Sequence, residues 1–396
     1  MDVKLDAAHW RRRRGMAKLL NALGAKDGLT RYVGGAVRDG LLALPVSDVD
    51  LATRLRPDQV VERLQAEGIK AVPTGFEHGT VTAVSDGHPY EVTTLRRDVE
   101  TFGRHATVAF TDDWQEDAAR RDFTINALMA DPVTGEVFDY FDGIADLENR
   151  HVRFIGDPFE RIAEDHLRIL RFFRFQARFG AGDPDSAALE ACTARSNDLM
   201  ALSRERIADE LLKLLAVDDP VATVRVMLGC EILKPVLPEI QAGAADSLER
   251  LVRCERDAGI APDPLRRLVA LLPRDPQVAG TIGARLKLSN RARKRLSCAA
   301  ESEISDYRAV AYRVGTECAV DRLLLAGRAP DAGLAVAWKP PRLPVTGGAL
   351  IKRGLVEGPV VSRTLRRIED RWISAGFPAG ADLEAIVSDA LAEALR

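Results

Sequence analysis

YVGGAVRDGLLALPVSDVDL, residues 32–51, is the part of this sequence that decides the fold. It begins at the end of an apolar stretch, residues 29–33, which is typical of a short strand. A helical pattern follows over residues 37–44, and Gly34 and Gly35 separate the two. Such glycines let backbone N–H groups approach a phosphate, and the helix N-terminus adds its dipole. The segment predicts a phosphate-binding turn, although an ordinary strand-to-helix turn would contain the same glycines.

Two aspartates one residue apart, Asp48 and Asp50, follow in the same stretch. In a strand, side chains at i and i+2 share a face and lie about 6.6 Å apart along the chain. Val49 and Leu51 then point into a core, so the alternation predicts a half-buried strand that presents two carboxylates at its solvent edge. Hard oxygen ligands on an open site suit Mg²⁺. The alternative is a loop of capping aspartates after Pro45.

Two charged residues, Arg38 and Asp39, lie in the first turn of the expected helix. Arg38 can bind a triphosphate, whereas Asp39 is expected only to favour the positive end of the helix. A plain turn explains the glycines but not the paired aspartates. Two metal ions held about 4 Å apart can activate a hydroxyl and stabilise a departing pyrophosphate. Together the residues predict metal-dependent nucleotidyl transfer.

At this point the sequence resembles a known family. G-G-A-V-R-D followed by D-V-D-L is similar to the head of class II CCA-adding tRNA nucleotidyltransferases and bacterial poly(A) polymerases. Further segments resemble motifs of that family and occur in its order: Y-E-V-T-T-L-R (90–96), R-R-D-F-T-I-N-A-L (120–128), E-D-H-L-R (164–168) and E-R-I-A-D-E (205–210). The ordered set, within the first 216 residues, is highly specific.

The resemblance implies a role for each matched residue. Asp48 and Asp50 would bind the metal ions, and Glu91 would supply a third carboxylate, as a further ligand or as the base. The set of nucleotide contacts that the resemblance implies is Gly34, Gly35, Arg38, Arg121, Asp165, Arg168 and Arg171.

Asp165 and Arg168 also suggest how a base could be chosen, because residues three apart on a helix are surface neighbours. Cytosine and adenine each present an amine donor beside a ring-nitrogen acceptor, and uracil and guanine reverse that pattern. A carboxylate that accepts and a guanidinium that donates would therefore pair with CTP or ATP. Unmatched hydrogen bonds would reject UTP and GTP, by about 10⁴ or more in favourable cases. The alternative is an ion pair between the two side chains within the helix.

An arginine stripe continues along the same helix. Arg171, Arg174 and Arg178 follow at near-helical intervals opposite an apolar side. Such a stripe is often only a solvated face, but the resemblance implies that Arg171 contacts nucleotide. Arg121 is expected in a helical segment, where Asp122 and Asn126, four residues apart, are expected to support the structure.

Composition limits the remaining classes of function. The chain has 396 residues, 46% of them hydrophobic, which is enough for two or more domains with real cores. The net charge of −3 argues against nucleic acid, but basic residues cluster at residues 11–14, 168–178, 291–295 and 363–371.

Five widely spaced cysteines predict neither a disulfide framework nor a zinc site, which suits a reducing cytoplasm. No apolar run is long enough for a membrane span, and the basic start lacks the apolar stretch of a secretion signal.

The predicted fold class is α+β. A nucleotidyltransferase head of the polymerase-β type with a mixed sheet (1–150) would precede an all-helical neck (151–216), body (217–338) and RNA-binding tail (339–396). Asp86 and Gly87 predict a hairpin turn, after which the second strand carries Glu91. Periodicity is lost over residues 96–111, and residues 103–105 predict a polar loop. In the tail, Arg363, Arg366 and Arg367 could face a phosphate backbone, or form a solvated helix end.

The function expected from the resemblance is addition of C, C and A to tRNA 3′ ends from CTP and ATP with Mg²⁺ and without a template. The residues alone predict only metal-dependent nucleotidyl transfer. Three alternatives remain at this point: a poly(A) polymerase of the same family, an enzyme restricted to addition of A, and a catalytically silent RNA-binding protein that keeps the fold. The oligomeric state does not follow from the sequence.

Overall fold

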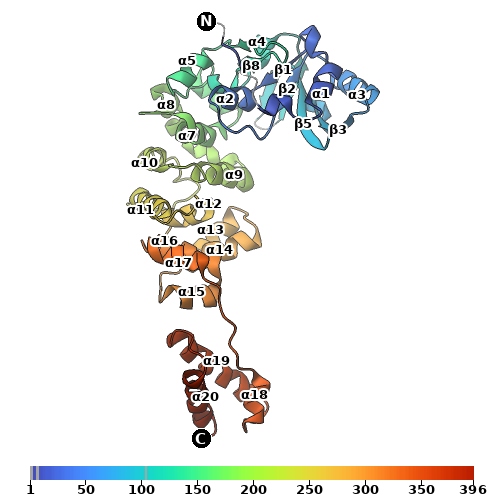
Figure 1. The fold of residues 1–396 in the computed structure, drawn as a ribbon. Helices are drawn as coiled ribbons and strands as arrows, with labels where there is room; N and C mark the ends of the chain where they lie inside the picture. Colours follow the sequence, from blue (N-terminus) through green and yellow to red (C-terminus); the bar gives the residue numbers. More distant parts are fainter. Residues whose placement is uncertain (1–2, 6–8, 103–104) are drawn as a thin grey trace. The chain divides into compact units, whose positions relative to one another are not determined.

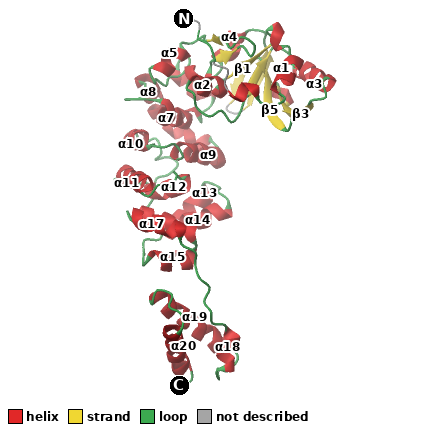
Figure 2. Cartoon of the chain, viewed as in Figure 1, coloured by secondary structure: helices red, strands yellow, loops and turns green. Residues whose placement is uncertain are grey.

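The computed structural model describes residues 3–5, 9–102 and 105–396. The chain forms two compact units, Met1–Pro238 and Glu239–Arg396. Strands are confined to the first unit and the second is helical, as Figure 2 shows. The α+β prediction is therefore confirmed. The division into head, neck, body and tail is finer than these two units and stays a prediction.

A mixed sheet of seven strands, in the order β3-β4-β5-β2-β1-β8-β9, organises the first unit. β2 and β5 pair in parallel and the other neighbours pair antiparallel. In Figure 1 the sheet lies in the blue to green part of the chain; α1 contacts β4, and α3 contacts β3 and β4. The strands are β1 (Thr30–Val33), β2 (Asp50–Thr53), β3 (Lys70–Gly75), β4 (Thr80–Ser85), β5 (His88–Thr94), β8 (Met129–Ala130) and β9 (Val137–Phe138), with β6 (Arg96–Phe102) and β7 (His105–Phe110) in a separate pair.

The expected hairpin between β4 and β5 is confirmed. Ser85 pairs with His88, and the two residues between them, Asp86 and Gly87, have φ of 48° and 80°. Positive φ at both central positions matches the twist of the flanking strands, so a short Asp-Gly turn is favoured here.

The loss of periodicity over residues 96–111 did not predict the two strands that form there, and His105, expected in a polar loop at residues 103–105, begins β7. β6 and β7 pair antiparallel, with a register shift between Asp98 and Glu100. Gly103 and Arg104 lie outside the described residues. The segment contains Val, Thr and Phe, which favour strands. The register shift interrupts the alternation of side chains between the two faces of the strand, which is the sequence pattern that predicts a strand.

Helices make up the rest of the first unit. Their bounds are α1 (Met16–Ala22), α2 (Gly35–Leu41), α3 (Pro57–Ala66), α4 (Trp114–Ala119), α5 (Gly143–Glu148), α6 (Pro158–Glu164), α7 (Arg168–Phe179), α8 (Ser186–Ala194), α9 (Arg204–Leu215) and α10 (Val221–Gly229), with 3-10 helices η1 (His9–Arg12), η2 (Ala25–Asp27), η3 (Phe76–His78), η4 (Thr124–Asn126) and η5 (Ser196–Ala201).

The predicted continuous helix through residues 164–168 is wrong. α6 ends at Glu164, and Asp165 is extended, with φ −152° and ψ 107°. Its Oδ1 accepts a hydrogen bond from Leu167 N at 3.1 Å, and its carbonyl accepts one from Arg168 N at 2.9 Å. Aspartate competes with helical hydrogen bonds in this way, which is why it favours helix starts. Asp165 therefore lies at the joint between α6 and α7.

The second unit consists of α11 (Ala244–Asp257), α12 (Pro264–Leu271), α13 (Pro276–Arg285), α14 (Asn290–Ala300), α15 (Tyr307–Val314), α16 (Thr316–Leu325), α17 (Ala329–Ala337), α18 (Gly347–Lys352), α19 (Pro359–Ser374) and α20 (Ala381–Ala394). Ile368 and Trp372 of α19 pack with Leu350 and Val387 in one of its cores. Among the described residues, no helix combines the length and the apolar character that crossing a membrane requires.

One feature of the second unit differs from the sequence expectation. Cys298 of α14 and Cys318 of α16 form a disulfide, so the prediction of no disulfide is wrong for this pair. Wide spacing in sequence did not reveal that the two helices are neighbours. In the tail, Arg367 forms an ion pair with Glu393 at 3.0 Å, whereas Arg363 and Arg366 have no ion pair within the described chain.

Candidate active site

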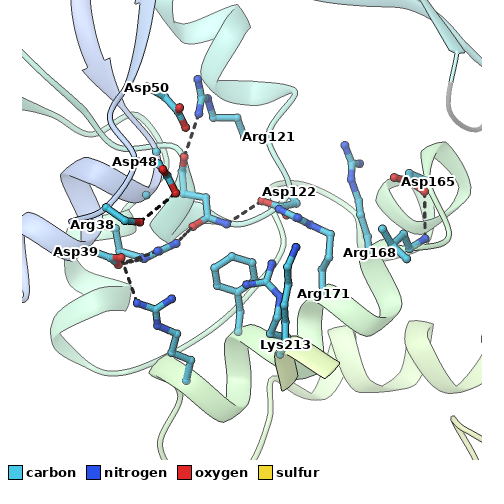
Figure 3. Close-up of a pocket in the computed structure, with 18 of the residues that line it drawn as sticks. Arg38, Asp39, Asp48, Asp50, Arg121, Asp122, Asp165, Arg168, Arg171 and Lys213 are labelled. Atoms are coloured by element: carbon cyan, nitrogen blue, oxygen red, sulfur yellow. Dashed lines mark hydrogen bonds and ion pairs between the residues drawn. The ribbon is translucent and has the colours of Figure 1, made fainter. Parts of the chain in front are cut away.

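A cavity of about 730 Å³ in the first unit brings together nine of the ten residues singled out from the sequence. In Figure 3, Asp48 and Asp50 lie on one side of it and Asp165 and Arg168 on the other, with Asp122 and Arg171 between them. Glu91 is the exception, because it does not line the cavity. The cavity is lined by Gly34, Gly35, Arg38, Asp39, Val46, Ser47, Asp48, Asp50, Arg120, Arg121, Asp122, Asn126, Asp165, Leu167, Arg168, Arg171, Arg174, Phe175, Arg178, Arg206 and Lys213.

The two aspartates have the alternation that the sequence predicts. Asp48 and Asp50 are exposed, whereas Val49 and Leu51 are 3% and 0% exposed. Asp50 begins β2, and Asp48 lies just before the strand, where it accepts a hydrogen bond from Ser47 Oγ at 3.0 Å. The sequence predicted both aspartates in the strand, but only Asp50 belongs to it. Core packing of the apolar side chains still turns both carboxylates towards the cavity.

Electrostatics around Asp50 favour a cation. The Asp50 side chain opens to the cavity, but the protein around it displaces much of its water, and this desolvation raises its pKa to about 6; Glu91 and Asp48 add to the rise, and Arg121 opposes it. Glu91 contributes because β5 runs parallel to β2 in a register that places it beside Asp50. Like charges held together disfavour ionisation until a positive charge joins them.

The donor set fits a metal that completes its shell with substrate oxygens. Within residues 3–5, 9–102 and 105–396, no three His, Cys, Asp or Glu side chains are gathered closely enough to hold an ion by themselves. Mg²⁺ is commonly bound through one or two carboxylates together with waters and substrate phosphates. Asp48 and Asp50 can provide those two carboxylates.

The glycine turn lies against Arg121. Gly34 has φ 66°, and a Cβ at this position would lie 3.1 Å from Arg121 Nη1. Arg121 lies in the turn between α4 and η4 and not in a helix, so that expectation is wrong. Its Nη2 donates to Asp117 Oδ2 at 3.1 Å. Asp117 is buried, so this contact fixes the arginine next to the glycines and Asp50.

Arg38 and Asp39 behave differently from the sequence expectation. Arg38 is only 5% exposed; its Nε donates to Asp39 Oδ1 at 2.8 Å and its Nη1 donates to Asn126 Oδ1. Asp39 also pairs with Arg178 of α7 at 3.2 Å. Asp39 therefore joins α2 to α7, and the prediction that it serves only the helix end is wrong. Arg38 lines the cavity, but these contacts already occupy much of its donor capacity.

Asp122 and Asn126 support the structure, as predicted. Asn126 Nδ2 donates to Asp122 Oδ1 at 2.9 Å, and Arg171 Nε donates to Asp122 Oδ2 at 2.7 Å. Burial would raise the pKa of Asp122, but Arg171 and Asn126 outweigh it and hold the pKa below its ordinary value. These contacts close a ring of polar side chains that starts and ends on α7, through Arg171, Asp122, Asn126, Arg38, Asp39 and Arg178.

Asp165 and Arg168 do not pair with each other, because the helix is broken between them. Asp165 Oδ2 accepts from Arg206 Nη2 at 2.7 Å, and Arg168 forms an ion pair with Glu164. The intrahelical Asp–Arg pair is therefore absent. Each of the two side chains is held by a different neighbour at the same end of the cavity.

The arginine stripe on α7 is confirmed as a wall of the cavity. Arg171, Arg174 and Arg178 line it, and Arg174 lies over the Phe175 ring, 4.4 Å from its centroid. Arg174 also donates to Glu210 Oε2 at 2.6 Å.

Several lining residues, among them Arg120, Arg206 and Lys213, were not predicted from the sequence. Arg206 and Glu210 belong to E-R-I-A-D-E, so that motif was the available signal. Arg174, Arg178 and Lys213 also line a second cavity of about 820 Å³, which is bounded by the loops after α7 and α9.

Known proteins resemble this chain over most of its length. A family model described as Poly A polymerase head domain matches residues 30–153, and one described as probable RNA and SrmB-binding site of polymerase A matches residues 183–243. The mitochondrial CCA tRNA nucleotidyltransferase 1 of Mus musculus is 34% identical over 92% of this chain and 87% of its own length. This chain belongs to the family of CCA-adding tRNA nucleotidyltransferases.

Other members of the CCA-adding family agree with this assignment. The CCA-adding enzyme of Streptococcus gordonii is 34% identical over 90% of this chain and 91% of its own length. The structure of the Bacillus stearothermophilus CCA-adding enzyme in complex with CTP has a TM-score of 0.72 and 26% identity, and the match covers 91% of this chain and 93% of that one. As a CCA-adding family member the chain is a nucleotidyltransferase, and the family implies a divalent metal.

Proposed function

We propose that this protein adds C, C and A to the 3′ ends of tRNA, using CTP, ATP and Mg²⁺ and no nucleic-acid template. One observation supports the proposal most strongly. The same cavity has the carboxylates of Asp48 and Asp50 at one end and Asp165 with Arg168 at the other. Its dimensions suit one nucleotide lying between the two ends.

The carboxylate end would carry the chemistry. Asp48 and Asp50 would hold Mg²⁺, with Glu91 beside Asp50 to increase the negative charge. When bound, the metal would favour attack by the tRNA 3′-hydroxyl on the α-phosphate and stabilise the pyrophosphate that leaves. The backbone at Gly34 and Gly35 can approach the phosphates. No covalent enzyme intermediate is required, because positioning and electrostatics suffice for such a transfer.

The opposite end would select the base. The Asp165 carboxylate can accept from the exocyclic amine of cytosine or adenine, and the Arg168 guanidinium can donate to the ring nitrogen. Uracil and guanine would leave both side chains unmatched, which strongly disfavours them. Arg206 and Glu164 would hold the two side chains at the correct spacing. Arg121 and Arg171 would complete the nucleotide contacts.

The second cavity gives the RNA a route to the site. It shares Arg174, Arg178 and Lys213 with the first cavity and adds Arg150, so cationic side chains line both. A polynucleotide backbone is attracted to such a surface in a salt-dependent way. We assign the terminal nucleotides of the tRNA to this second cavity. We also propose that the protein acts in the cytoplasm.

Incubation of the protein with a tRNA transcript that lacks its CCA end tests the proposal. CTP alone should give two additions, CTP with ATP three, and UTP or GTP none. Long tails from ATP alone would instead identify a poly(A) polymerase. Asp48→Ala should abolish incorporation while tRNA still binds, whereas Asp58→Ala, on the exposed side of α3, should leave it unchanged. Binding without incorporation by the unmodified protein would indicate the silent RNA-binding alternative.

A further inference from the structure

Arg13 makes an unusual connection to the loop that carries Asp48. The loop runs from Leu42 to Val49 between α2 and β2, and most of it is exposed. Arg13 Nη1 donates to Ser47 O at 2.9 Å and Arg13 Nη2 donates to Val46 O at 2.5 Å. One guanidinium thus holds two successive carbonyls directly before the carboxylate. Hydrogen bonds from a charged donor are the stronger class.

The backbone of Arg13 is itself fixed against the hairpin that leads to Glu91. Ser85 Oγ donates to Gly15 O at 3.0 Å, and Arg14 lies 3.8 Å from Asp86. Gly15 has φ 80°, and a Cβ there would lie 2.5 Å from Ser85 Oγ. The close approach therefore requires glycine. Burial of Met16 in the core anchors the following helix.

Arg13 consequently spans the two elements that present the acidic groups. Two residues after it, Gly15 O accepts from Ser85 of the β4–β5 hairpin, and the Arg13 side chain ends on the Asp48 loop. Burial raises the pKa of Tyr90, and the charge of Arg13 opposes that rise, which places Arg13 near β5 as well. Without the guanidinium, the loop would lose both contacts and the position of Asp48 relative to Asp50 would no longer be restrained from this side.

We propose that Arg13 is a positioning residue that sets Asp48 for divalent metal binding. Arg13 lies before residue 30, where the matched family region begins, so none of the shared motifs includes it. The inference rests on the proposed metal role of Asp48. It assigns a function to the basic cluster at residues 11–14 other than contact with RNA.

The test compares Arg13→Ala with Arg12→Ala, its exposed neighbour in η1. Mn²⁺ binding is measured by electron paramagnetic resonance in the presence of α,β-methylene-CTP. Arg13→Ala should weaken Mn²⁺ binding about tenfold, the loss expected for a charged hydrogen bond. The melting temperature should stay close to the original value. Arg13→Lys should recover part of the affinity, and Arg12→Ala should change it less than about twofold.

Hydrogen exchange provides a second readout that does not depend on turnover. Peptides covering residues 42–49 should exchange faster in Arg13→Ala but not in Arg12→Ala. Unchanged Mn²⁺ affinity and unchanged exchange in a folded Arg13→Ala protein would overturn the inference. If Asp48→Ala retained activity and Mn²⁺ affinity, the proposed function itself would fail. The two failures are therefore distinguishable.

Discussion

At the scale of the single residue, Asp165 has two tasks that a substitution can separate. Its carboxylate accepts a hydrogen bond from Leu167 N just before α7, and it also lines the end of the cavity proposed to hold the base. Asparagine caps helices about as well as aspartate, so Asp165→Asn should fold normally. It replaces an acceptor by a donor, and we expect kcat/KM for CTP to fall about 100-fold and incorporation of UTP to rise relative to CTP. Single-nucleotide incorporation assays measure both.

The matched control is Asp185→Asn. Asp185 caps α8 by accepting from Ala188 N at 2.9 Å and does not line the cavity. The Asp185→Asn variant should leave the preference for CTP over UTP unchanged. If Asp165→Asn kept the original preference, the base would have to be read by other side chains.

Asp50 makes a residue-scale prediction about pH. Because its pKa is raised to about 6 in the folded protein, protonation favours folding. That contribution is fully present below the ordinary pKa near 4 and is lost as the pH rises through 6. A bound cation offsets the loss only where the carboxylate is ionised. The rise in melting temperature caused by Mg²⁺ should therefore be larger at pH 7.5 than at pH 5.0.

Melting curves with MgCl₂, against NaCl of equal ionic strength, measure this difference. Asp50→Asn should remove the pH dependence of the Mg²⁺ effect, and Asp58→Asn should retain it. An equal effect of Mg²⁺ at both pH values in the unmodified protein would contradict the raised pKa.

At the scale of the element, the glycine that starts α2 can be compared with the glycine that starts α20. Gly34 and Gly380 have nearly the same backbone angles, φ 66° with ψ −128° and φ 63° with ψ −132°, so alanine at either site should cost a similar backbone strain of more than about 1 kcal/mol. Only Gly34 has Arg121 within reach of a new Cβ, whereas Gly380 has open space. Gly34→Ala should therefore raise KM for CTP several-fold, and Gly380→Ala should not.

Urea unfolding and steady-state kinetics on both variants provide the measurement. Equal losses of stability with a change of KM in Gly34→Ala alone would match the prediction. A change of KM in both would show that backbone strain, and not displacement of Arg121, is responsible.

Local patterns were sufficient for some elements and not for others. The glycine turn, the Asp-Gly hairpin and the alternation at residues 48–51 are set by neighbours in sequence, and all were predicted. The break at Asp165 was not, because the apolar spacing continues across it. At the break, Asp165 Oδ1 accepts a hydrogen bond from Leu167 N in place of a helical bond. Likewise, Arg206 and Asp165 are 41 residues apart in the sequence, and hydrophobic periodicity does not show that their side chains meet.

At the scale of the whole molecule, the disulfide predicts unequal responses of the two units to reductant. Cys298 and Cys318 are 20 residues apart, and a crosslink that closes such a loop stabilises by about 3 kcal/mol. Reduction, or Cys298→Ser with Cys318→Ser, should lower the stability of the second unit. The first unit, which contains the cavity, should unfold as before.

Tryptophan fluorescence can follow the two units separately. Trp10 and Trp114 report on the first, and Trp338 and Trp372 on the second, once the other pair is replaced by Phe. Cys254→Ser, at a free cysteine of the second unit, is the control and should not alter the response to reductant. A transition of the first unit that also shifts on reduction would contradict the prediction.

Fold class and the polar lining of the site could be read from the sequence, but the side-chain partners could not. Arg38 and Asp39 were interpreted from their place in a helix turn alone. Their actual partners, Asn126 and Arg178, lie 88 and 139 residues away. Such contacts depend on how the sheet and α7 are packed, which composition and periodicity do not specify.

The ring that leaves α7 at Arg171 and returns to it at Arg178 has a consequence for how this enzyme can diverge. Arg171 lines the cavity proposed to hold the nucleotide but also satisfies buried Asp122, which in turn holds Asn126 and, through it, Arg38. Altering Arg171 to accommodate a new base would leave a buried carboxylate unpaired. Variants with a new nucleotide preference should therefore require compensating changes on the phosphate side, so specificity and turnover would evolve jointly.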